Sequence, residues 1–400
     1  MAGRIAIVGG GPAGLIAAET LAEAGATVTV YEQMRSVGRK FLLAGRGGLN
    51  LTHTEPIEQL LARYGSARPH LEAAVNAFSP AQLRQWSASH DETTFVGTSG
   101  RVFPHSFRAT PLLRSWLRRL DGLGVAIAAQ HRWTGWDSGG ALQFDTGDGP
   151  RSVDADAVLF ALGGASWPRV GSNGVWAATF EEAGIEITPL QPANTGVHVD
   201  WSSVLRERFA GTPIKNTTFT VGNDQIRGDA VVTDTGLEGG PIYALGPGVR
   251  SELAATGSAT MRLDMHPDLD RDRLTERLSK RRPKASLSSW LSSAQVTPVG
   301  VALARDVTAN QIPENPAELA ALLKDLPVPI TAVGSLDRAI STAGGVAWTA
   351  LDSDFMVRQR PGTFVAGEML DWEAPTGGYL LQACFSTGVA AAQGILAYLD

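Results

Sequence analysis

The glycine-rich segment at residues 9–14 constrains the fold of this chain more than any other feature. It reads GGGPAG, follows the apolar run Arg4–Val8 and precedes a helix-forming stretch at Leu15–Ala24. A second apolar run, Ala26–Tyr31, ends at Glu32. A strand, a glycine turn, a helix and a second strand make a βαβ unit, which predicts an α/β domain with a parallel sheet.

Three glycines of this segment fit the pattern G-x-G-x-x-G. Gly9 permits a tight turn, Gly11 lets backbone amides approach a pyrophosphate, and Gly14 lets the helix pack closely on the strand. The helix N-terminus adds N–H groups and partial positive charge for phosphates. Glu32 can accept hydrogen bonds from ribose hydroxyls. The sequence therefore predicts a dinucleotide site, against the alternative of a purely structural turn.

Composition excludes several classes of protein. The chain has 400 residues, of which 44% are hydrophobic, so it is neither a small disulfide-stapled scaffold nor a disordered protein. Cys384 is the only cysteine, which excludes an internal disulfide or a cysteine-based metal centre. The seven histidines show no metal-ligand spacing, so we predict no metal. A net charge of −6 argues against a protein that coats nucleic acid.

The N-terminus shows no secretion signal, and no long apolar run predicts a membrane-spanning helix. We therefore expect a cytoplasmic protein without membrane contact. Helical patterns occur within 57–88 and at Leu112–Leu123, Asp270–Lys284, Leu287–Ser293, Pro298–Thr308, Pro316–Leu326 and about Tyr379–Leu399. Strand patterns occur at Val125–Ala128, His131–Trp136, Ala141–Thr146, Ser152–Leu159 and through most of 196–265.

This order predicts a nucleotide-binding domain made of two separate pieces of chain. The first piece covers residues 1–190 and the second 335–400. Between them we expect a β-rich domain at 191–267 and a helical subdomain at 268–334. The insertion is a candidate for the part that sets specificity.

A second binding motif lies near the C-terminus. The segment Thr363–Ala366 reads as a short strand, is followed by Gly367 and Glu368, and leads through Gly377 and Gly378 into the last helix. Together with the N-terminal motif, this arrangement resembles the FAD-binding domain of the glutathione-reductase-like flavoproteins. The resemblance implies that Gly367 and Glu368 lie by the ribityl and pyrophosphate, with the last helix aimed at the flavin pyrimidine ring.

Six further blocks narrow the resemblance. GRKFLLAGRGGLNLTH (38–53), GRVFPHSFRAT (100–110), ALGGASWPRVGSNG (161–174), TDTGLEGGPI (233–242), STAGGV (341–346) and AGEMLDWEAPTGGY (366–379) resemble, in order and spacing, the BaiN/YhiN-like flavoproteins. These are NAD(P)/FAD-dependent oxidoreductases, and the similarity runs from residue 5 to about 395. It implies an α/β fold with a discontinuous Rossmann-like FAD-binding domain and an inserted β-barrel-like and helical region.

The two motifs and the resemblance together imply a set of cofactor-binding residues. It comprises Gly9, Gly11, Pro12, Ala13, Gly14, Glu32, Gln33, Arg39, Lys40, Gly45, Arg46, Gly47, Asn50, Ala161, Gly163, Gly367, Glu368, Gly377, Gly378, Tyr379 and Leu380. We expect FAD as the cofactor. G-x-G-x-x-G in a βαβ context occurs once, so NADH or NADPH would act as a transient reductant, and a protein partner is the alternative electron source.

Members of this family reduce activated C=C bonds in steroid-type substrates or form dihydrouridine in ribosomal RNA. The resemblance therefore implies hydride transfer between flavin and a C=C or C–C bond of a small molecule. Two alternatives stay open: an RNA-modifying flavoenzyme, and a flavin-binding regulatory protein without turnover. The family loop commonly reads GGGRCN, but Leu49 stands here in place of its cysteine. This argues against dihydrouridine synthesis and leaves His53, His105 and Tyr379 as candidate proton donors.

Several other residues have a functional and a structural interpretation. Arg46, flanked by glycines, could bind the FAD phosphates or an anionic substrate, with a solvated surface arginine as the alternative. Arg101 and His105 lie in a loop bounded by Gly100 and Pro104, which favours a site role, and a structural hydrogen-bonded histidine is the alternative for His105. Trp167 and Trp372 could stack on a planar substrate, although packing is the commoner fate of tryptophan. We expect Cys384 to be a buried, inert thiol. The run Arg271–Lys284 holds seven basic residues and two acids, so it is either a solvated helix face or an RNA-contacting surface.

Overall fold

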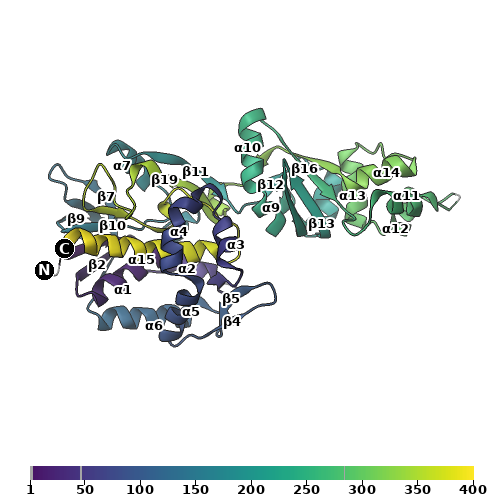
Figure 1. The fold of residues 1–400 in the computed structure, drawn as a ribbon. Helices are drawn as coiled ribbons and strands as arrows, with labels where there is room; N and C mark the ends of the chain where they lie inside the picture. Colours follow the sequence, from purple (N-terminus) through teal and green to yellow (C-terminus); the bar gives the residue numbers. More distant parts are fainter. Residues whose placement is uncertain (1–2, 46, 283) are drawn as a thin grey trace. The chain divides into compact units, whose positions relative to one another are not determined.

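The computed structural model describes residues 3–45, 47–282 and 284–400. The chain forms two compact units (Figure 1). Unit 1 contains Met1–Gln191 and Ile340–Asp400, and unit 2 contains Pro192–Ala339. Unit 1 is therefore built from two pieces of chain that lie on either side of unit 2 in the sequence.

A five-stranded parallel sheet forms the centre of unit 1. Its order is β20-β10-β1-β2-β6. The strands are β1 (Arg4–Val8), β2 (Thr27–Glu32), β6 (Ala126–Ala129), β10 (Ala157–Phe160) and β20 (Thr363–Val365). β20 comes from the C-terminal piece and pairs with β10. The sheet is thus completed only when both ends of the chain come together, and the expected discontinuous α/β fold is confirmed.

Helices α1 (Pro12–Glu23) and α15 (Tyr379–Leu399) pack along each other beside this sheet (Figure 1). α15 is long and apolar enough to span a membrane by length and composition, which the sequence analysis did not recognise. Its apolar stretch, however, is 56% buried inside the protein. Ala383, Phe385, Ala391 and Ile395 of α15 are fully buried in the core of unit 1, as expected for a core helix.

The remaining helices of unit 1 cover its edges. They are α2 (Arg39–Ala44), α3 (Ile57–Ala62), α4 (Arg68–Ala77), α5 (Pro80–Ser89), α6 (Ala109–Gly122) and α7 (Trp176–Glu182). α5 begins as its sequence predicts, with Pro80 in the first turn and Ser79 and Gln82 forming a capping box.

Three small sheets complete unit 1. The antiparallel meander contains β7 (His131–Trp136), β8 (Leu142–Thr146) and β9 (Gly149–Val153). A second sheet contains β3 (Thr52–His53), β4 (Thr94–Val96) and β5 (Arg101–Pro104), and a third pairs β11 (Ile187–Ala193) with β19 (Ser341–Val346). The single strand expected at Ser152–Leu159 was wrong, because the chain breaks between β9 and β10 to pass from the meander into the parallel sheet.

Unit 2 is built on a seven-stranded antiparallel sheet with the order β17-β16-β13-β14-β15-β12-β18. The strands are β12 (Val197–His198), β13 (Pro213–Val221), β14 (Asp224–Val232), β15 (Gly236–Glu238), β16 (Ala259–Asp264), β17 (Leu326–Ile330) and β18 (Ala332–Val333). Only Thr331 separates β17 from β18. The two ends of the sheet are therefore continuous in the chain, which gives it a barrel-like connectivity.

Unit 2 also carries helices that the sequence analysis partly missed. α8 (Ser203–Arg208), α9 (Gly240–Ala244) and α10 (Gly246–Thr256) interrupt the region expected to be strands. α11 (Arg271–Ser279), α12 (Leu287–Ser293), α13 (Pro298–Val307) and α14 (Pro316–Lys324) form the expected helical run. The helix expected at Asp270–Lys284 ends at Ser279, so the last basic residues of that stretch lie outside it.

Candidate functional site

A first cavity lies at the carboxyl ends of the parallel strands of unit 1. Its wall is formed by the glycine turn, the end of β2, the start of β7, the loop after β10 and the segment Ala366–Glu368. Ligands of α/β sheets bind at this edge because the loops that follow parallel strands converge there. The sequence motifs at the two ends of the chain therefore meet around one space.

The glycine turn has two kinds of glycine. Gly9 has φ +115°, and a Cβ atom there would overlap the carbonyl oxygen of Ala161. At Gly14 a Cβ atom would overlap the carbonyl oxygen of Gly9. Gly11, in contrast, faces open space, with no protein atom within 4 Å of such a Cβ. Gly9 and Gly14 are thus required by the fold itself, whereas Gly11 keeps room at the cavity wall.

The N-terminus of α1 faces this open space. Gly11 is the N-cap residue, and no side chain caps the helix. Free N–H groups and the partial positive charge of the helix end are therefore available to an anion. Backbone geometry rather than a side chain makes this part of the wall fit phosphate.

Glu32 is held in place by the backbone around it. Its two carboxylate oxygens accept hydrogen bonds from the amides of Gly10 (3.0 Å) and Met34 (2.8 Å). Burial raises the pKa of Glu32, and these hydrogen bonds together with the nearby Arg39 only partly oppose that shift. The carboxylate is fixed at the end of β2, where it lines the first cavity.

A second polar centre joins the two pieces of unit 1. Lys40 Nζ lies 2.6 Å from Glu368 Oε2 and donates to Ser166 Oγ at 2.7 Å. The other oxygen of Glu368 accepts from the amide of Thr342 at 3.1 Å. This network holds α2, the loop after β10 and the segment after β20 together at the cavity wall.

A second cavity adjoins the first. Pro12, Lys40, Glu368 and Cys384 line both. The rest of its wall is mainly apolar or glycine: Phe41, Ala44, Gly48, Leu49, Ile340, Gly377, Gly378, Leu380 and Leu381, together with Asn50, Arg101 and Thr376. A cavity whose wall carries several charged side chains thus continues into one that carries fewer.

Four buried polar atoms in these walls have no hydrogen-bond partner among the described residues. Arg39 Nε, His131 Nε2 and Trp133 Nε1 line the first cavity, and Asn50 Oδ1 lines the second. Buried polar groups are nearly always paired in folded proteins, so unpaired ones in a cavity wall point to a ligand. The first cavity therefore offers three unpaired polar atoms to a ligand and the second offers one.

Comparison with known proteins identifies the family to which the chain belongs. Residues 3–394 match the family described as the HI0933-like protein Rossmann domain. The chain belongs to this family. It is a family of FAD-binding oxidoreductases, and the protein is an FAD-dependent enzyme of that class.

Individual members are distant in sequence. The chain is 24% identical to the 3-dehydro-bile acid delta(4,6)-reductase of Clostridium scindens over 97% of this chain and 98% of that protein. It is 23% identical to the ribosomal RNA dihydrouridine synthase of Escherichia coli, over 98% and 97%. The structure of 3-ketosteroid delta1-dehydrogenase from Sterolibacterium denitrificans has the same fold, with a TM-score of 0.56, 12% identity and 99% of each chain covered.

Most of the expected cofactor-binding residues of this HI0933-like protein line one of the two cavities. The first brings together Gly9, Gly11, Pro12, Ala13, Glu32, Gln33, Arg39, Lys40, Ala161, Gly163, Gly367 and Glu368. The second adds Asn50, Gly377, Gly378 and Leu380. Gly14 and Gly45 lie behind the wall, packed against Gly9 and Ala109, and Gly47 is exposed. Arg46 lies outside the described residues.

The three candidate proton donors do not line either cavity. His53 Nε2 bonds the carbonyl of Ser99, and its ring stacks on Tyr379. Burial and the hydrogen bond to Glu55 raise the pKa of Tyr379 well above its usual value. His105 packs against Phe95 on the β4–β5 hairpin. These three residues are thus not among the described residues whose side chains line the two cavities.

The other residues singled out in the sequence are Trp372, Trp167 and Cys384. Trp372 is buried and donates to the carbonyl of Gly367, so it has a structural role. Trp167 is exposed, with φ +63°, and lines neither cavity. Cys384 is only partly buried and lies in the wall of both cavities. The expectation that this thiol is buried in the apolar interior was therefore wrong. Burial and the Glu368 charge raise its pKa to about 12, which keeps it a thiol.

Several wall residues were not expected from sequence. In the first cavity they are His131, Arg132 and Trp133 at the start of β7, Val170, Ser172 and Asn173 from the connection after β10, and Trp176 at the start of α7. In the second they are Phe41, Ile340 and Thr376. Some of these positions lie within the sequence blocks that carry the resemblance, but no residue type or spacing marks any of them individually as a wall residue. Among the described residues, no group of three or more His, Cys, Asp or Glu side chains forms a metal site.

Proposed function

We propose that this HI0933-like protein transfers hydride between its flavin and a C=C or C–C bond of a mainly apolar small molecule bound in the second cavity. The observation that carries the proposal is the apolar cavity itself, which shares Pro12, Lys40, Glu368 and Cys384 with the dinucleotide cavity. When bound, FAD supplies the hydride chemistry, and the protein supplies binding, orientation and electrostatics.

The wall residues suit FAD from one end to the other. Glu32 would accept from the ribose hydroxyls, and the uncapped N-terminus of α1 would bind the pyrophosphate beside Gly11. Arg39, His131 and Trp133 offer unpaired nitrogen atoms in the same cavity. Asn50 and the N-terminus of α15 would contact the ring system, where the positive end of the helix favours an electron-rich group.

The apolar wall of the second cavity favours an alkene conjugated to a carbonyl group. Leu49, Leu380 and Phe41 would exclude water around such a substrate. The relative from Clostridium scindens is named for reduction of a dienone-type steroid, which is the same kind of bond. Leu49, where the family commonly has cysteine, makes this wall more apolar still.

Anaerobic turnover tests the proposal. FAD-loaded protein is reduced with NADH, NADPH or dithionite and mixed with an α,β-unsaturated ketone, and the product is identified by mass spectrometry. We expect the saturated ketone and reoxidised flavin. The proposed reaction would be overturned if the flavin stays reduced with every alkene tested but is rapidly reoxidised by oxygen. If neither NADH nor NADPH reduces the flavin, the reductant is another electron donor.

A second candidate function is modification of RNA. Two relatives are named ribosomal RNA dihydrouridine synthase, and the stretch Arg271–Lys284 is basic. Several of its cations have partners within the protein: Lys280 pairs with Glu276, and the guanidinium of Arg281 lies over the ring of Trp290. Arg282 and Lys284 are exposed and remain suited to phosphate contact.

Salt-dependent RNA binding tests this second candidate. Changing Arg282 and Lys284 to Glu should weaken binding to ribosomal RNA and reduce its salt dependence by about two charges if the surface contacts phosphate. The matched control changes the exposed Arg206 and Arg208 of α8 to Glu, which alters net charge equally. Equal effects of the two pairs would exclude an RNA site at 271–284.

A further inference from the structure

The second cavity carries one uncompensated charge among its described wall residues. Lys40 and Glu368 neutralise each other across 2.6 Å. Cys384 is a neutral thiol. This leaves the guanidinium of Arg101, at the start of β5, in a wall that is otherwise mainly apolar.

Arg101 has no acidic side chain within ion-pair distance among the described residues, and its side chain makes no hydrogen bond there. The contrast with nearby Arg63 is informative. Arg63 binds Glu55 through two nitrogen atoms, at 3.2 and 2.8 Å. The fold therefore satisfies one guanidinium of this region internally and leaves the other open to a ligand.

The position of Arg101 is fixed by the strands around it. β5 pairs with β3, so Arg101 lies opposite His53, and Thr52 lies opposite Val102. The hydroxyl of Thr52 donates to Gln382 Oε1 of α15 at 2.7 Å, with both residues fully buried. β3 thus ties Arg101 to α15, whose N-terminus lines the same cavity through Gly377 and Gly378.

Arg101 is exposed although it lines the cavity, so it stands at the mouth rather than at the inner end. An exposed guanidinium at the mouth cannot polarise a group buried against the flavin. It can bind a charged group on the outer end of a substrate, where the planar fork of Arg matches two oxygen atoms. The uncapped N-terminus of α15 adds positive potential to the same wall.

We infer that Arg101 binds the anionic group, a carboxylate or an equivalent oxyanion, of an otherwise apolar substrate in the second cavity. The inference rests on the proposed function, because it assumes that the second cavity is the substrate site. Arg101 holds the outer end of the substrate. It thereby sets the affinity for the substrate and the position of the substrate along the cavity, while the reacting bond lies deeper. The substrate class is then an apolar acid rather than a neutral apolar molecule.

Calorimetry with two probes of equal length tests the inference. Octanoate and octanol are titrated into the FAD-loaded protein at low salt, with no turnover. Wild-type protein should bind octanoate about tenfold more tightly than octanol, in line with a charge-assisted hydrogen bond. Arg101→Gln should reduce this preference to within about twofold, and Arg101→Lys should retain part of it.

Arg108→Gln is the matched control, because Arg108 is also exposed, follows β5 as the N-cap residue of α6 and lines neither cavity. It should bind both probes like the wild type. The inference is overturned if the wild type binds the two probes equally, or if Arg101→Gln keeps the preference. If Arg101→Gln keeps the octanoate preference but lowers the midpoint potential of the flavin, Arg101 instead compensates the negative charge of the reduced flavin. Failure of alkene reduction with a normal octanoate preference would overturn only the proposed reaction.

Discussion

The two adjoining cavities of unit 1 are built on different principles. The first is made mainly by backbone: a glycine turn, a helix N-terminus and strand ends, with Glu32 held by amide groups. The second is made mainly by apolar side chains from separate segments, including Phe41, Leu49 and Ile340. A cofactor shared by many enzymes can be bound by backbone geometry, whereas a particular substrate is recognised by side chains.

The largest expected effect tests whether the first cavity depends on backbone. Gly9→Ala places a side chain at φ +115° and against the Ala161 carbonyl. We expect a loss of about 3–5 kcal/mol in the free energy of unfolding and no FAD binding. Chemical denaturation of the apoprotein and FAD retention during gel filtration measure both. A stable Gly9→Ala protein would show that this turn is not constrained as the structure indicates.

Gly11→Ala is the matched substitution in the same turn. The backbone there is extended, with φ −85° and ψ −177°, and a Cβ atom would meet no protein atom within 4 Å. The apoprotein should therefore unfold like the wild type, while FAD affinity falls about 10- to 100-fold because the methyl group occupies the space next to the phosphates. Unchanged FAD affinity by fluorescence titration would contradict the placement of the pyrophosphate.

The same contrast explains what the sequence could predict. The turn at 9–14 and Glu32 are local in sequence, and their roles follow from the backbone conformation that each position needs. The helix after Gly378 and the start of α5 at Pro80 follow from capping and end signals. These parts of the fold and of the first cavity were predicted.

Much of the wall of the second cavity depends on long-range packing. Its glycines at 377 and 378 and Asn50 were expected from sequence, and Arg101 was singled out as a binding candidate, but the way these segments meet could not be predicted. Arg101, Ile340 and Phe41 are brought together by β5, by the segment before β19 and by α2. Likewise, α10 was taken for strand because glycines and prolines surround it. Cys384 was expected in the interior because its helix is apolar, but its turn of the helix faces the cavities.

A buried pair beneath α1 gives a smaller, pH-dependent effect. Glu19 of α1 accepts from Trp86 Nε1 at 3.0 Å, and its other oxygen lies 3.1 Å from His90 Nε2. Burial lowers the pKa of His90, but the hydrogen bond and charge of Glu19 together with the hydrogen bond to the Trp86 carbonyl outweigh burial, and the net shift of the pKa is upward. A raised pKa means that the pair stabilises the fold fully below the ordinary histidine pKa and that this contribution is lost as pH rises through the raised value.

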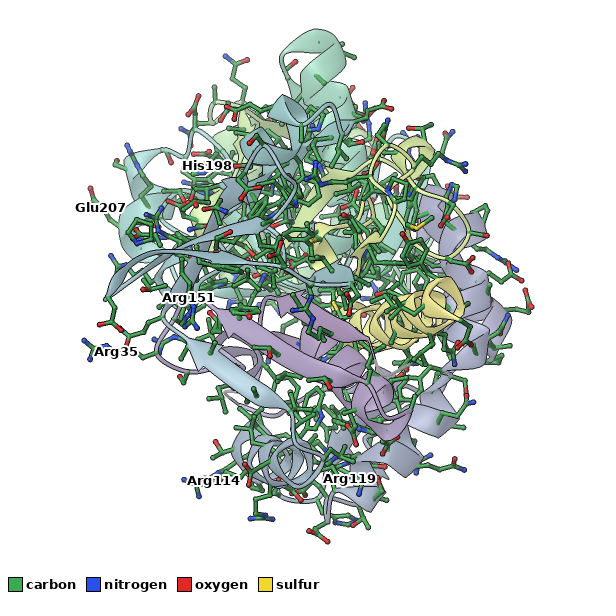
Figure 2. The ribbon with its side chains drawn as sticks, turned by 90° about the vertical axis from the view of Figure 1, so that its left-hand side faces the viewer. Arg35, Arg114, Arg119, Arg151, His198 and Glu207 are labelled. Atoms are coloured by element: carbon green, nitrogen blue, oxygen red, sulfur yellow. The ribbon has the colours of Figure 1, made fainter. Side chains whose placement is uncertain are left out.

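We therefore expect Glu19→Gln to cost about 1–2 kcal/mol of unfolding free energy at pH 5–6 and less above pH 8. Denaturant unfolding of both proteins across this pH range measures the difference. Arg119 Nε lies 3.9 Å from Glu19 Oε1. Arg114, on the same helix α6, makes no ion pair among the described residues. Figure 2 labels both arginines. Arg114→Gln is the control, and a pH-independent gap for Glu19→Gln would contradict the assignment.

The smallest effect concerns Cys384, one of the four residues that line both cavities. Because the pKa of Cys384 is raised to about 12, little thiolate forms at neutral pH. Apoprotein should react with Ellman's reagent at least about 100-fold more slowly than free cysteine at pH 8, and Cys384→Ser should change alkene reduction by less than about threefold. Rapid labelling, or a large loss of activity in this variant, would make Cys384 part of the chemistry.

The central claim is that the first cavity binds the ribose and pyrophosphate part of FAD, and that the substrate binds in the second cavity beside the flavin ring. Ile340 lines only the second cavity and is 42% exposed, so Ile340→Trp should fill the mouth without disturbing the fold or the first cavity. The decisive measurement is anaerobic stopped-flow reoxidation of the reduced flavin by an α,β-unsaturated ketone in wild type and Ile340→Trp. The account predicts equal FAD affinity and reoxidation at least about tenfold slower in the variant. Equal reoxidation rates, with the second cavity blocked, would contradict it.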